Sequence, residues 1–245
     1  MTTTTDFPRG AFKNDTKRLS IQKSNIKNLT KEDFVGLPAL VYLHFLNGTK
    51  VSYVNLRGNS IVKIDSDAMR GGQINTFICN YCGLTTDKVF GNDSFLLQMT
   101  SLRRLDLGFN EITHVPKDAF KGLSNITLLR LYYNNISAIE ENPFTAFTDL
   151  KSFEIQKNPF KCDCHLGWFH EFSLSHFKTQ HGGDQLLKNM TCASPTNLAD
   201  KKFSDLETSQ FCCTAINSPG PVCDVDSNRT TVLPDSKGTT VRPTS

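Results

Sequence analysis

The sequence lacks any long apolar run. No stretch of its 245 residues approaches the roughly 18 to 20 apolar residues that would cross a bilayer as a helix. The opening, MTTTTDFPRG, also lacks the apolar segment of a signal peptide, as expected of a trimmed mature fragment, and any membrane anchor is expected outside this sequence. Excess charge is missing too, because 27 basic and 24 acidic residues leave a net charge of +3. Neither nucleic acid nor an anionic membrane surface is an expected partner.

Signatures of catalysis are also missing from the sequence. Its six histidines lie outside any nucleophile, phosphate-binding or metal-binding motif, at positions 44, 114, 165, 170, 176 and 181. We therefore expect no enzymatic activity, no cofactor and no metal. A hydrolytic enzyme is the alternative from another functional class.

Cysteines and glycosylation motifs, by contrast, are plentiful and indicate the secretory route. Two of the eight cysteines lie in mid-chain and six lie between positions 162 and 223. Eight Asn-x-Ser/Thr sequons have no proline in the middle position, and their asparagines are Asn14, Asn28, Asn47, Asn92, Asn125, Asn135, Asn189 and Asn228. We expect a secreted or cell-surface glycoprotein.

A segment that repeats at a fixed spacing is the strongest pattern in the chain. Leu102, Ile126 and Leu150 are 24 residues apart, and they begin the segments LRRLDLGFNEI, ITLLRLYYNNI and LKSFEIQKNPF. Looser copies run back to the start as RLSIQKSNI, VSYVNLRGNSI and INTFICNYCGL. The pattern L-x-x-L-x-L-x-x-N-x-L resembles the leucine-rich repeat. It implies an α/β solenoid, a curved crescent with a parallel β-sheet on its concave face.

Individual positions of the repeat have expected structural roles. The asparagines at positions 59, 110, 134 and 158 are expected to hydrogen-bond backbone inside the turns. Cys79 falls at an inward apolar position and Cys82 at the asparagine position, so we interpret both as buried thiols, with a disulfide or metal pair as the alternative.

The first repeats depart from the regular spacing. Leu19 and Val54 are 35 residues apart, and Asn47-Gly48 lies between alternating apolar runs, which is a hairpin signal. Leu43 lies 24 residues after Leu19, so either Leu43 or Val54 begins the second strand. We favour Val54, with Asn47-Gly48 as a protruding turn.

After the last repeat comes a cysteine-rich segment. NPFKCDCHLGWFHEF, TCASPTNLADKKFSDL and FCC resemble the C-terminal cap of extracellular leucine-rich-repeat proteins, most of all variable lymphocyte receptors and next Toll-like receptor ectodomains. The resemblance implies a bond from Cys162 to Cys192 and one from Cys164 to Cys212 or Cys213, and it leaves a third pairing with Cys223 open. A zinc site made by Cys162, Cys164, His165 and Cys192 is the competing interpretation. The cysteine-rich N-terminal cap usual in these families is missing before Leu19.

These patterns divide the chain into four expected parts. Residues 1–38 form an N-terminal cap-like segment with the first repeat, and residues 39–159 form the other repeats. Residues 160–223 form the disulfide-bonded C-terminal cap, which covers the last apolar layer of the stack. Residues 224–245 are a Thr/Ser/Pro-rich stalk that we expect to be disordered.

Outward-pointing strand residues are the candidate ligand site. One row is expected to hold Ser20, Asn55, Ile78, Asp106, Arg130 and Glu154, and the flanking rows Arg104, Ser152, Arg57, Asn80, Tyr132 and Gln156. A further row gives an aromatic stripe of Tyr81, Phe109 and Tyr133. We expect Asp106, Arg130, Glu154 and the tyrosines to centre the site. The alternatives are a charge ladder that neutralises itself, aromatic residues that only cover the core edge or lie under a glycan, and a site in the cap loop 177–185.

The expected function is recognition without catalysis. The resemblance to variable lymphocyte receptors implies a monomer or weak dimer that binds a microbial, bacterial surface ligand on its concave face. Cell adhesion or growth-factor binding by an extracellular protein or glycan partner is the alternative, because the same scaffold supports both.

Overall fold

The computed structural model describes residues 51–59, 61, 64, 69, 73–177 and 189–211. It also places the backbone of short strands at 18–21, 28–29, 42–45, 213–214 and 221–222. None of the helices in these described parts is long and apolar enough to cross a membrane.

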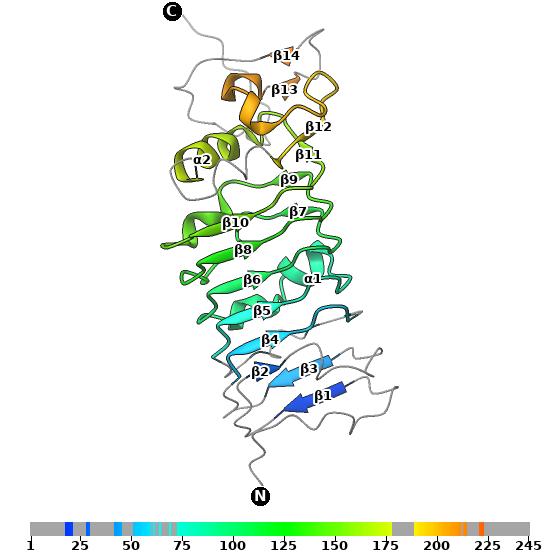
Figure 1. Ribbon diagram of the computed structural model, residues 1–245, viewed down its shortest axis with the longest axis vertical. Helices are drawn as coiled ribbons and strands as arrows, with labels where there is room; N and C mark the ends of the chain where they lie inside the picture. The colour runs from blue at the N-terminus through cyan, green and yellow to red at the C-terminus, as the bar shows by residue number, and fades with distance from the viewer. Residues whose placement is uncertain are drawn as a thin grey trace, which may run out of the picture.

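A parallel sheet of six strands runs along the molecule (Figure 1) in the order β10-β8-β6-β5-β4-β2. The strands are β2 (Asn28–Leu29), β4 (Tyr53–Asn55), β5 (Thr76–Ile78), β6 (Arg104–Asp106), β8 (Leu128–Arg130) and β10 (Ser152–Glu154). Pairing joins equivalent repeat positions, as in Leu105 opposite Phe77 and Leu129. The predicted parallel sheet is confirmed.

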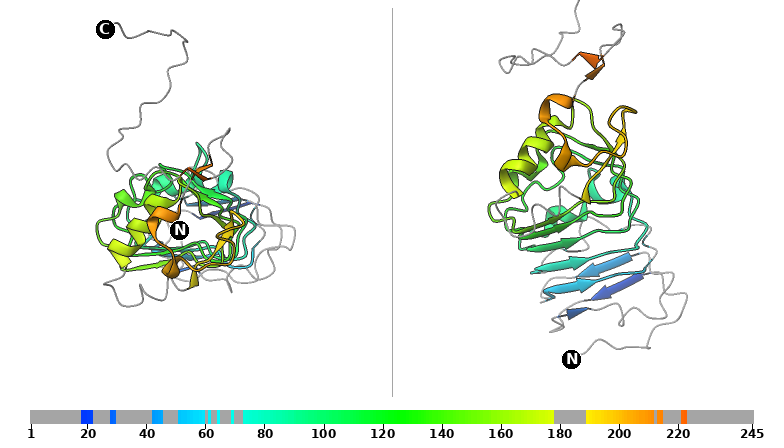
Figure 2. Two further views of the ribbon diagram at one scale, coloured as in Figure 1. Left: turned by 90° about the horizontal axis from the view of Figure 1, so that it is seen from above. Right: turned by 45° about the horizontal axis from the view of Figure 1, so that its top comes forward.

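Behind the sheet lies a continuous apolar core. In the main sheet, the middle residue of each of β4, β5, β6, β8 and β10 points inward and is buried, and these residues are Val54, Phe77, Leu105, Leu129 and Phe153. The return segments close the core with α1 (Thr86–Phe90), the 3-10 turns η2 (Phe95–Gln98) and η3 (Pro143–Ala146), and the small parallel pair β7 (His114–Val115) and β9 (Ala138–Ile139). Figure 2 shows these returns facing the sheet across the interior.

Buried asparagines link one repeat to the next, as predicted. The Asn134 Nδ2 donates to Leu107 O and Leu131 O, both at 3.0 Å, while its Oδ1 accepts from Ile112 N at 3.1 Å. Asn158 repeats the arrangement one unit further along. Each amide thus satisfies backbone groups of two neighbouring turns that would otherwise be buried without partners.

At the N-terminal end, both candidate positions lie in strands. Val54 lies in β4 of the main sheet, whereas Leu43 lies in β3 (Tyr42–Phe45), which pairs in parallel with β1 (Arg18–Ile21) in a separate two-stranded sheet. Ser20 pairs with His44 there, so its predicted place in the row with Asn55 is wrong. The 24-residue spacing from Leu19 to Leu43 is the actual register of that small sheet. Asn47-Gly48 lies outside the described residues.

Cys79 and Cys82 form a disulfide, so the prediction of two buried thiols is wrong. Both residues are fully buried. The intervening Tyr81 has a left-handed backbone, φ 56°, which turns the chain so that the two Cα atoms are 5.6 Å apart, within bridging range. The Cys82 Sγ lies 3.3 Å from Leu56 O, where an asparagine of this position would donate, but a disulfide sulfur carries no proton and forms no such bond.

Restoring the repeat pattern at this bridge should restore stability. Removing the disulfide in Cys79→Ala/Cys82→Ala should lower the free energy of unfolding by about 2 to 3 kcal/mol. Cys79→Leu/Cys82→Asn should recover most of that loss, because equivalent repeats have leucine and a buried asparagine here, as Leu107 and Asn110 show. Urea unfolding of both variants is the measurement. If the Leu/Asn variant is no more stable than the Ala/Ala variant, the disulfide does not stand in for the leucine and buried asparagine of the other repeats.

The C-terminal cap covers the end of the stack. Its elements are β11 (Phe160–Lys161), α2 (Gly167–Phe177), β12 (Cys192–Ser194), η4 (Phe203–Asp205), η5 (Thr208–Gln210), β13 (Cys213–Thr214) and β14 (Pro221–Val222). β11 pairs with β12, and Cys162 is bonded to Cys192, which confirms that pairing and excludes the zinc alternative. Cys164 is also disulfide-bonded, and its partner lies outside the described side chains.

A buried histidine joins α2 to the rest of the cap. His170 is fully buried, with Nε2 3.1 Å from Phe203 O and Nδ1 2.9 Å from Thr208 Oγ1. The carbonyl can only accept, so Nε2 carries the proton of a neutral ring and Nδ1 accepts from the hydroxyl. Burial lowers the pKa of His170 below its ordinary value of 6.5.

This histidine should make the cap sensitive to acid. The unfolded chain takes up a proton at His170 at a higher pH than the folded chain, so its contribution to stability is complete above the unfolded pKa and is lost as pH falls through and below 6.5. The melting temperature of the wild type should therefore fall more steeply with acidification than that of His170→Gln, which has no titrating ring. Parallel pH profiles for the two proteins would contradict this.

Candidate functional site

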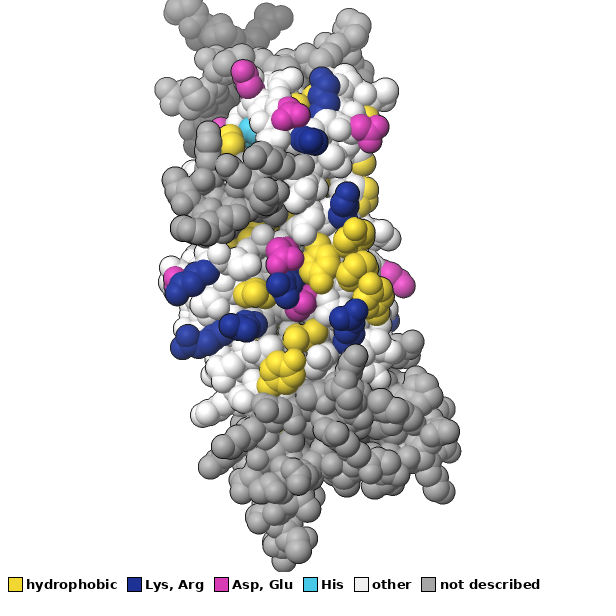
Figure 3. Space-filling view, viewed as in Figure 1, with side chains coloured by type: hydrophobic (Ala, Val, Ile, Leu, Met, Phe, Trp, Pro, Cys, Tyr) yellow, Lys and Arg dark blue, Asp and Glu magenta, His cyan; other side chains and the backbone are white. Residues whose placement is uncertain are grey.

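Charged and hydrophobic side chains gather on the outer surface of the sheet, which we call the sheet face (Figure 3). Asn55, Ile78, Asp106, Arg130 and Glu154 lie directly opposite one another in successive strands. The predicted row therefore exists from β4 to β10. Because each residue stands at the same position of its strand, the backbone register alone aligns the row.

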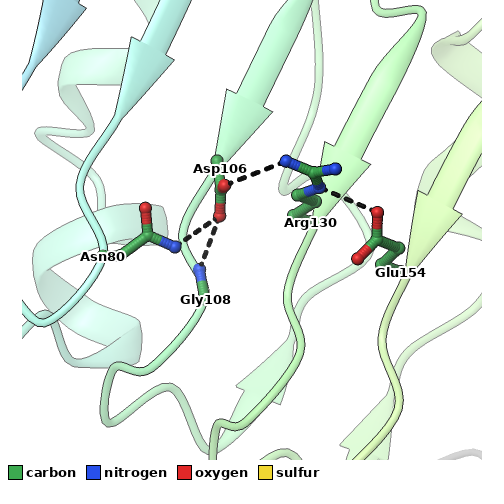
Figure 4. Close-up of polar contacts among 5 residues, drawn as sticks. All are labelled: Asn80, Asp106, Gly108, Arg130 and Glu154. Carbon is green, nitrogen blue, oxygen red and sulfur yellow. Dashed lines mark hydrogen bonds and ion pairs between the residues drawn. The ribbon is translucent and has the colours of Figure 1, made fainter. Parts of the chain in front are cut away.

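Asp106 is the most buried charged group of this row, with a residue exposure of 7%. Its Oδ1 accepts from Asn80 Nδ2 at 2.7 Å and from Gly108 N at 3.1 Å (Figure 4). Its Oδ2 lies 3.5 Å from Arg130 Nη1. Hydrogen bonds and a nearby cation compensate the burial of this carboxylate.

Arg130 continues the contacts toward the cap, since its Nε donates to Glu154 Oε1 at 2.8 Å. Partial burial acts to lower the pKa of Arg130, but the hydrogen bond and the two carboxylates outweigh burial and raise it. Asn80, Asp106, Arg130 and Glu154 thus form one line, the charge ladder, in which two carboxylates share one guanidinium. The contacts of the alternative charge ladder are therefore present, but two carboxylates and one guanidinium leave it a net charge of −1, so it does not neutralise itself.

Three aromatic rings form a second line along the edge of the sheet face, the aromatic ledge of Tyr81, Phe109 and Tyr133. Phe109 stacks on Tyr81 at 4.3 Å between ring centroids and on Tyr133 at 4.6 Å, with planes within 13° of parallel. Arg57 lies 5.4 Å over the outer side of the Tyr81 ring. The two tyrosines are each 48% exposed, so the ledge is a surface and not only a cover for the core.

Backbone geometry holds the aromatic ledge rigidly. Tyr81, Phe109 and Tyr133 all have left-handed φ values of 52° to 56°, and Gly58 has the same repeat position with φ 78°. A non-glycine residue in this region costs roughly 1 kcal/mol, which ring stacking of about 0.5 to 1.5 kcal/mol per pair offsets.

Tyr132 connects the ledge to the charge ladder. Its ring packs edge-on to Phe109 at 5.3 Å between centroids. A Cβ at Gly108 would come within 2.8 Å of the Tyr132 ring, so a larger residue there would displace the ring from its present place. Burial, and then the charge of Asp106, raise the pKa of the Tyr132 hydroxyl, which therefore stays protonated.

Other expected site residues also lie on the sheet face. Arg104 is exposed at the start of β6, and Asn55 Oδ1 accepts from Arg57 N at 3.0 Å. Sequence reasoning missed Tyr53, Thr76 and Leu128, which form the first outward row with Arg104 and Ser152. The repeat frame itself carried that signal, because each is one residue before a core position.

Several alternatives can be placed only in part. The described sequon asparagines Asn92, Asn125, Asn135 and Asn189 are all exposed. Of the cap loop 177–185, residues 178–185 lie outside the described part of the chain, and so do the side chains of the other four sequons. Among the described residues, no cluster of three or more His, Cys, Asp or Glu side chains is arranged to hold a metal ion.

Comparison with known proteins agrees with this architecture. The leucine rich repeat family matches residues 100–160. Trophoblast glycoprotein of Macaca fascicularis is 25% identical over 126 residues, covering 51% of this chain and 29% of that protein. Toll-like receptor 10 of Bos taurus is 21% identical over 226 residues, covering 85% and 27% respectively. The chain thus spans less than a third of each of these relatives.

Among solved structures, the crystal structure of human 5T4 (Wnt-activated inhibitory factor 1, trophoblast glycoprotein) is similar to this chain. It is 16% identical, covers 79% of this chain and 76% of its own, and has a TM-score of 0.49. The repeat match at residues 100–160, the stacked parallel strands and the Cys162–Cys192 bond make this chain a leucine-rich-repeat solenoid with a disulfide-bonded cap.

Proposed function

We propose that this chain is a non-enzymatic extracellular recognition protein whose ligand binds on the sheet face, across the charge ladder and the aromatic ledge. The observation that carries the proposal is the exposure of Tyr81 and Tyr133, in the turns after β5 and β8, beside a partly buried line of charges on paired strands. Aromatic and charged side chains held on rigid elements are the usual centres of protein binding surfaces.

The same groups are poorly suited to catalysis. Asp106 and Glu154 both face Arg130, so neither carboxylate is available as a general base without breaking an ion pair. Arg130 is only partly exposed and pairs with two acids, Asp106 and Glu154. These ion pairs fix the orientation of the three side chains and do not activate any of them as a nucleophile or a base. Binding is the function that this geometry supports best.

Our first candidate ligand is a microbial, bacterial surface component, recognised in the manner of variable lymphocyte receptors. Support comes from the cysteine spacing of the cap and the Thr/Ser/Pro-rich tail in the sequence, together with the Cys162–Cys192 bond. In this proposal the protein works outside the cell as a monomer or weak dimer, without nucleic acid as a partner.

The alternative function is cell adhesion or growth-factor binding. Whether the ligand is microbial or not, the ring geometry of the aromatic ledge favours a protein ligand. Both faces of Phe109 are covered by its neighbours, and Arg57 covers one face of Tyr81. A sugar ring packs its C–H groups on an open, electron-rich ring face, whereas ring edges and hydroxyls attract carbonyl and carboxylate oxygens. The ledge offers mainly edges and hydroxyls, which suit a polypeptide surface better than a polysaccharide.

A binding screen with a charge variant tests this proposal. The purified chain is exposed to whole bacterial cells, isolated wall polymers and host extracellular domains. Asp106→Asn/Glu154→Gln keeps the shape of both side chains but removes both charges. It should weaken binding to whichever target the wild type binds in the screen about tenfold. Glu141→Gln is the matched control, because Glu141 pairs with Lys117 among the return segments. Equal binding by wild type and double variant would place the site elsewhere, and binding to host proteins alone would end the microbial proposal.

A further inference from the structure

An open hollow lined by polar residues lies beside the sheet, on the side where the chain leaves the strands. It has a volume of about 430 Å³ and is lined by Thr85, Thr86, Asp87, Glu111, Thr113, His114 and Asn135. Three successive repeats build it: Thr85 and Glu111 are joined by a parallel bridge, and Asn135 N donates to Ile112 O at 2.9 Å. The charge ladder and the aromatic ledge contribute no residue to it.

Two of the lining hydroxyls are engaged in hydrogen bonds within the protein, whereas other lining groups are not. The Thr86 and Thr113 hydroxyls lie 3.1 Å apart, and Thr113 N donates to Thr86 Oγ1 at 2.9 Å. On the rim, Thr85 Oγ1 makes no capping bond to α1, and Glu111 is exposed. The rim therefore offers a hydroxyl and carboxylate oxygens, a set that favours a neutral ligand rich in hydroxyl donors.

One lining residue is itself a modification signal. Asn135 begins the sequon Asn135-Ile136-Ser137, its side chain is exposed, and Ser137 is exposed two residues later. A sugar attached to the amide of Asn135 would be tethered at the rim of the hollow. Tethering gives a high effective concentration, so contacts too weak to capture a free sugar are sufficient to hold a linked one.

We propose that Asn135 is glycosylated in the secreted protein and that the first N-acetylglucosamine residues of its glycan lie in this hollow. In the attachment step Asn135 Nδ2 loses a proton and bonds to C1 of the first sugar, while the bond from C1 to the diphosphate of a lipid-linked oligosaccharide donor breaks. The lipid diphosphate is the leaving group, and the proton from Asn135 is released together with it. Glu111 and Thr85 accept hydrogen bonds from the sugar hydroxyls.

Site-resolved enzymatic deglycosylation tests the proposal. The full chain is expressed in a eukaryotic secretory host, and glycopeptide mass spectrometry follows peptide N-glycosidase release at Asn135 and at Asn92, an exposed sequon that does not line the hollow. In the native protein, release at Asn135 should be about fivefold slower, the factor that one net hydrogen bond provides. After denaturation the two rates should converge.

A rim variant separates hollow binding from general steric protection. Thr85→Val/Glu111→Ala removes the proposed acceptors at side chains outside the core, and it should bring native release at Asn135 to the rate at Asn92. Two results would overturn the proposal: an unmodified Asn135 in the secreted protein, or native release at Asn135 as fast as at Asn92. If the rim variant fails to fold, the native-to-denatured comparison on the wild type still decides.

Discussion

Replacing Asn110 with alanine should lower the free energy of unfolding by about 3 to 5 kcal/mol. Its Oδ1 accepts from Cys82 N at 3.0 Å and Leu84 N at 3.1 Å, and its Nδ2 donates to Cys79 O at 2.7 Å and Leu107 O at 2.9 Å. Alanine would leave these buried backbone groups of two repeats without partners, and each costs about 1 to 3 kcal/mol when unsatisfied.

Chemical denaturation of Asn110→Ala beside Asn92→Ala provides the measurement. Asn92 is exposed in the turn after α1, so its replacement should change stability by less than about 0.5 kcal/mol. Equal stability of the two variants would contradict the view that buried amides hold neighbouring repeats together.

Removing the Cys162–Cys192 bond with Cys162→Ala/Cys192→Ala should cost about 3 to 4 kcal/mol, because the bond closes a loop with a sequence separation of 30. Both residues are buried and the bond lies next to the β11–β12 pair, so lost packing adds to the loss of the cross-link. The double variant also avoids a free thiol that would exchange with the neighbouring bonds.

The loss should be local to the cap. In a solenoid each unit contacts mainly its neighbours, so hydrogen exchange in α2 should accelerate strongly while exchange in β6, which β8 and β10 separate from the cap, changes little. Uniform acceleration across α2 and β6 would instead show that the solenoid and its cap unfold as one cooperative unit.

Regular spacing explains why so much of the sheet is predictable. The 24-residue interval places Leu105, Leu129 and Phe153 at the centre of paired strands, and the structure has them opposite one another and buried. The cross-strand row from Asn55 to Glu154 follows from the same frame, because the side-chain alternation of a strand has a period of two.

What escaped prediction depends on backbone conformation between those anchors. Cys79 and Cys82 both point inward in the repeat frame, but only the left-handed turn at Tyr81 brings them within bonding distance. The same conformation at Phe109 and Tyr133 stacks rings that the spacing alone places merely in line. Ser20 lies beside His44 because Leu19 and Leu43 keep the 24-residue spacing, and the prediction for Ser20 is wrong because it favours Val54 over Leu43 for the second strand.

The most direct test of the sheet face as the binding surface is a binding isotherm for Tyr81→Asn/Tyr133→Asn against the target found in the screen. Asparagine tolerates the left-handed backbone of both positions, so the rings are lost while the turns are kept. Leu97→Asn is the matched control, since Leu97 is 47% exposed but lies in η2 among the return segments. We expect the double variant to bind at least about 30-fold more weakly, with Leu97→Asn equal to wild type. Wild-type affinity in the tyrosine variant would contradict the assignment.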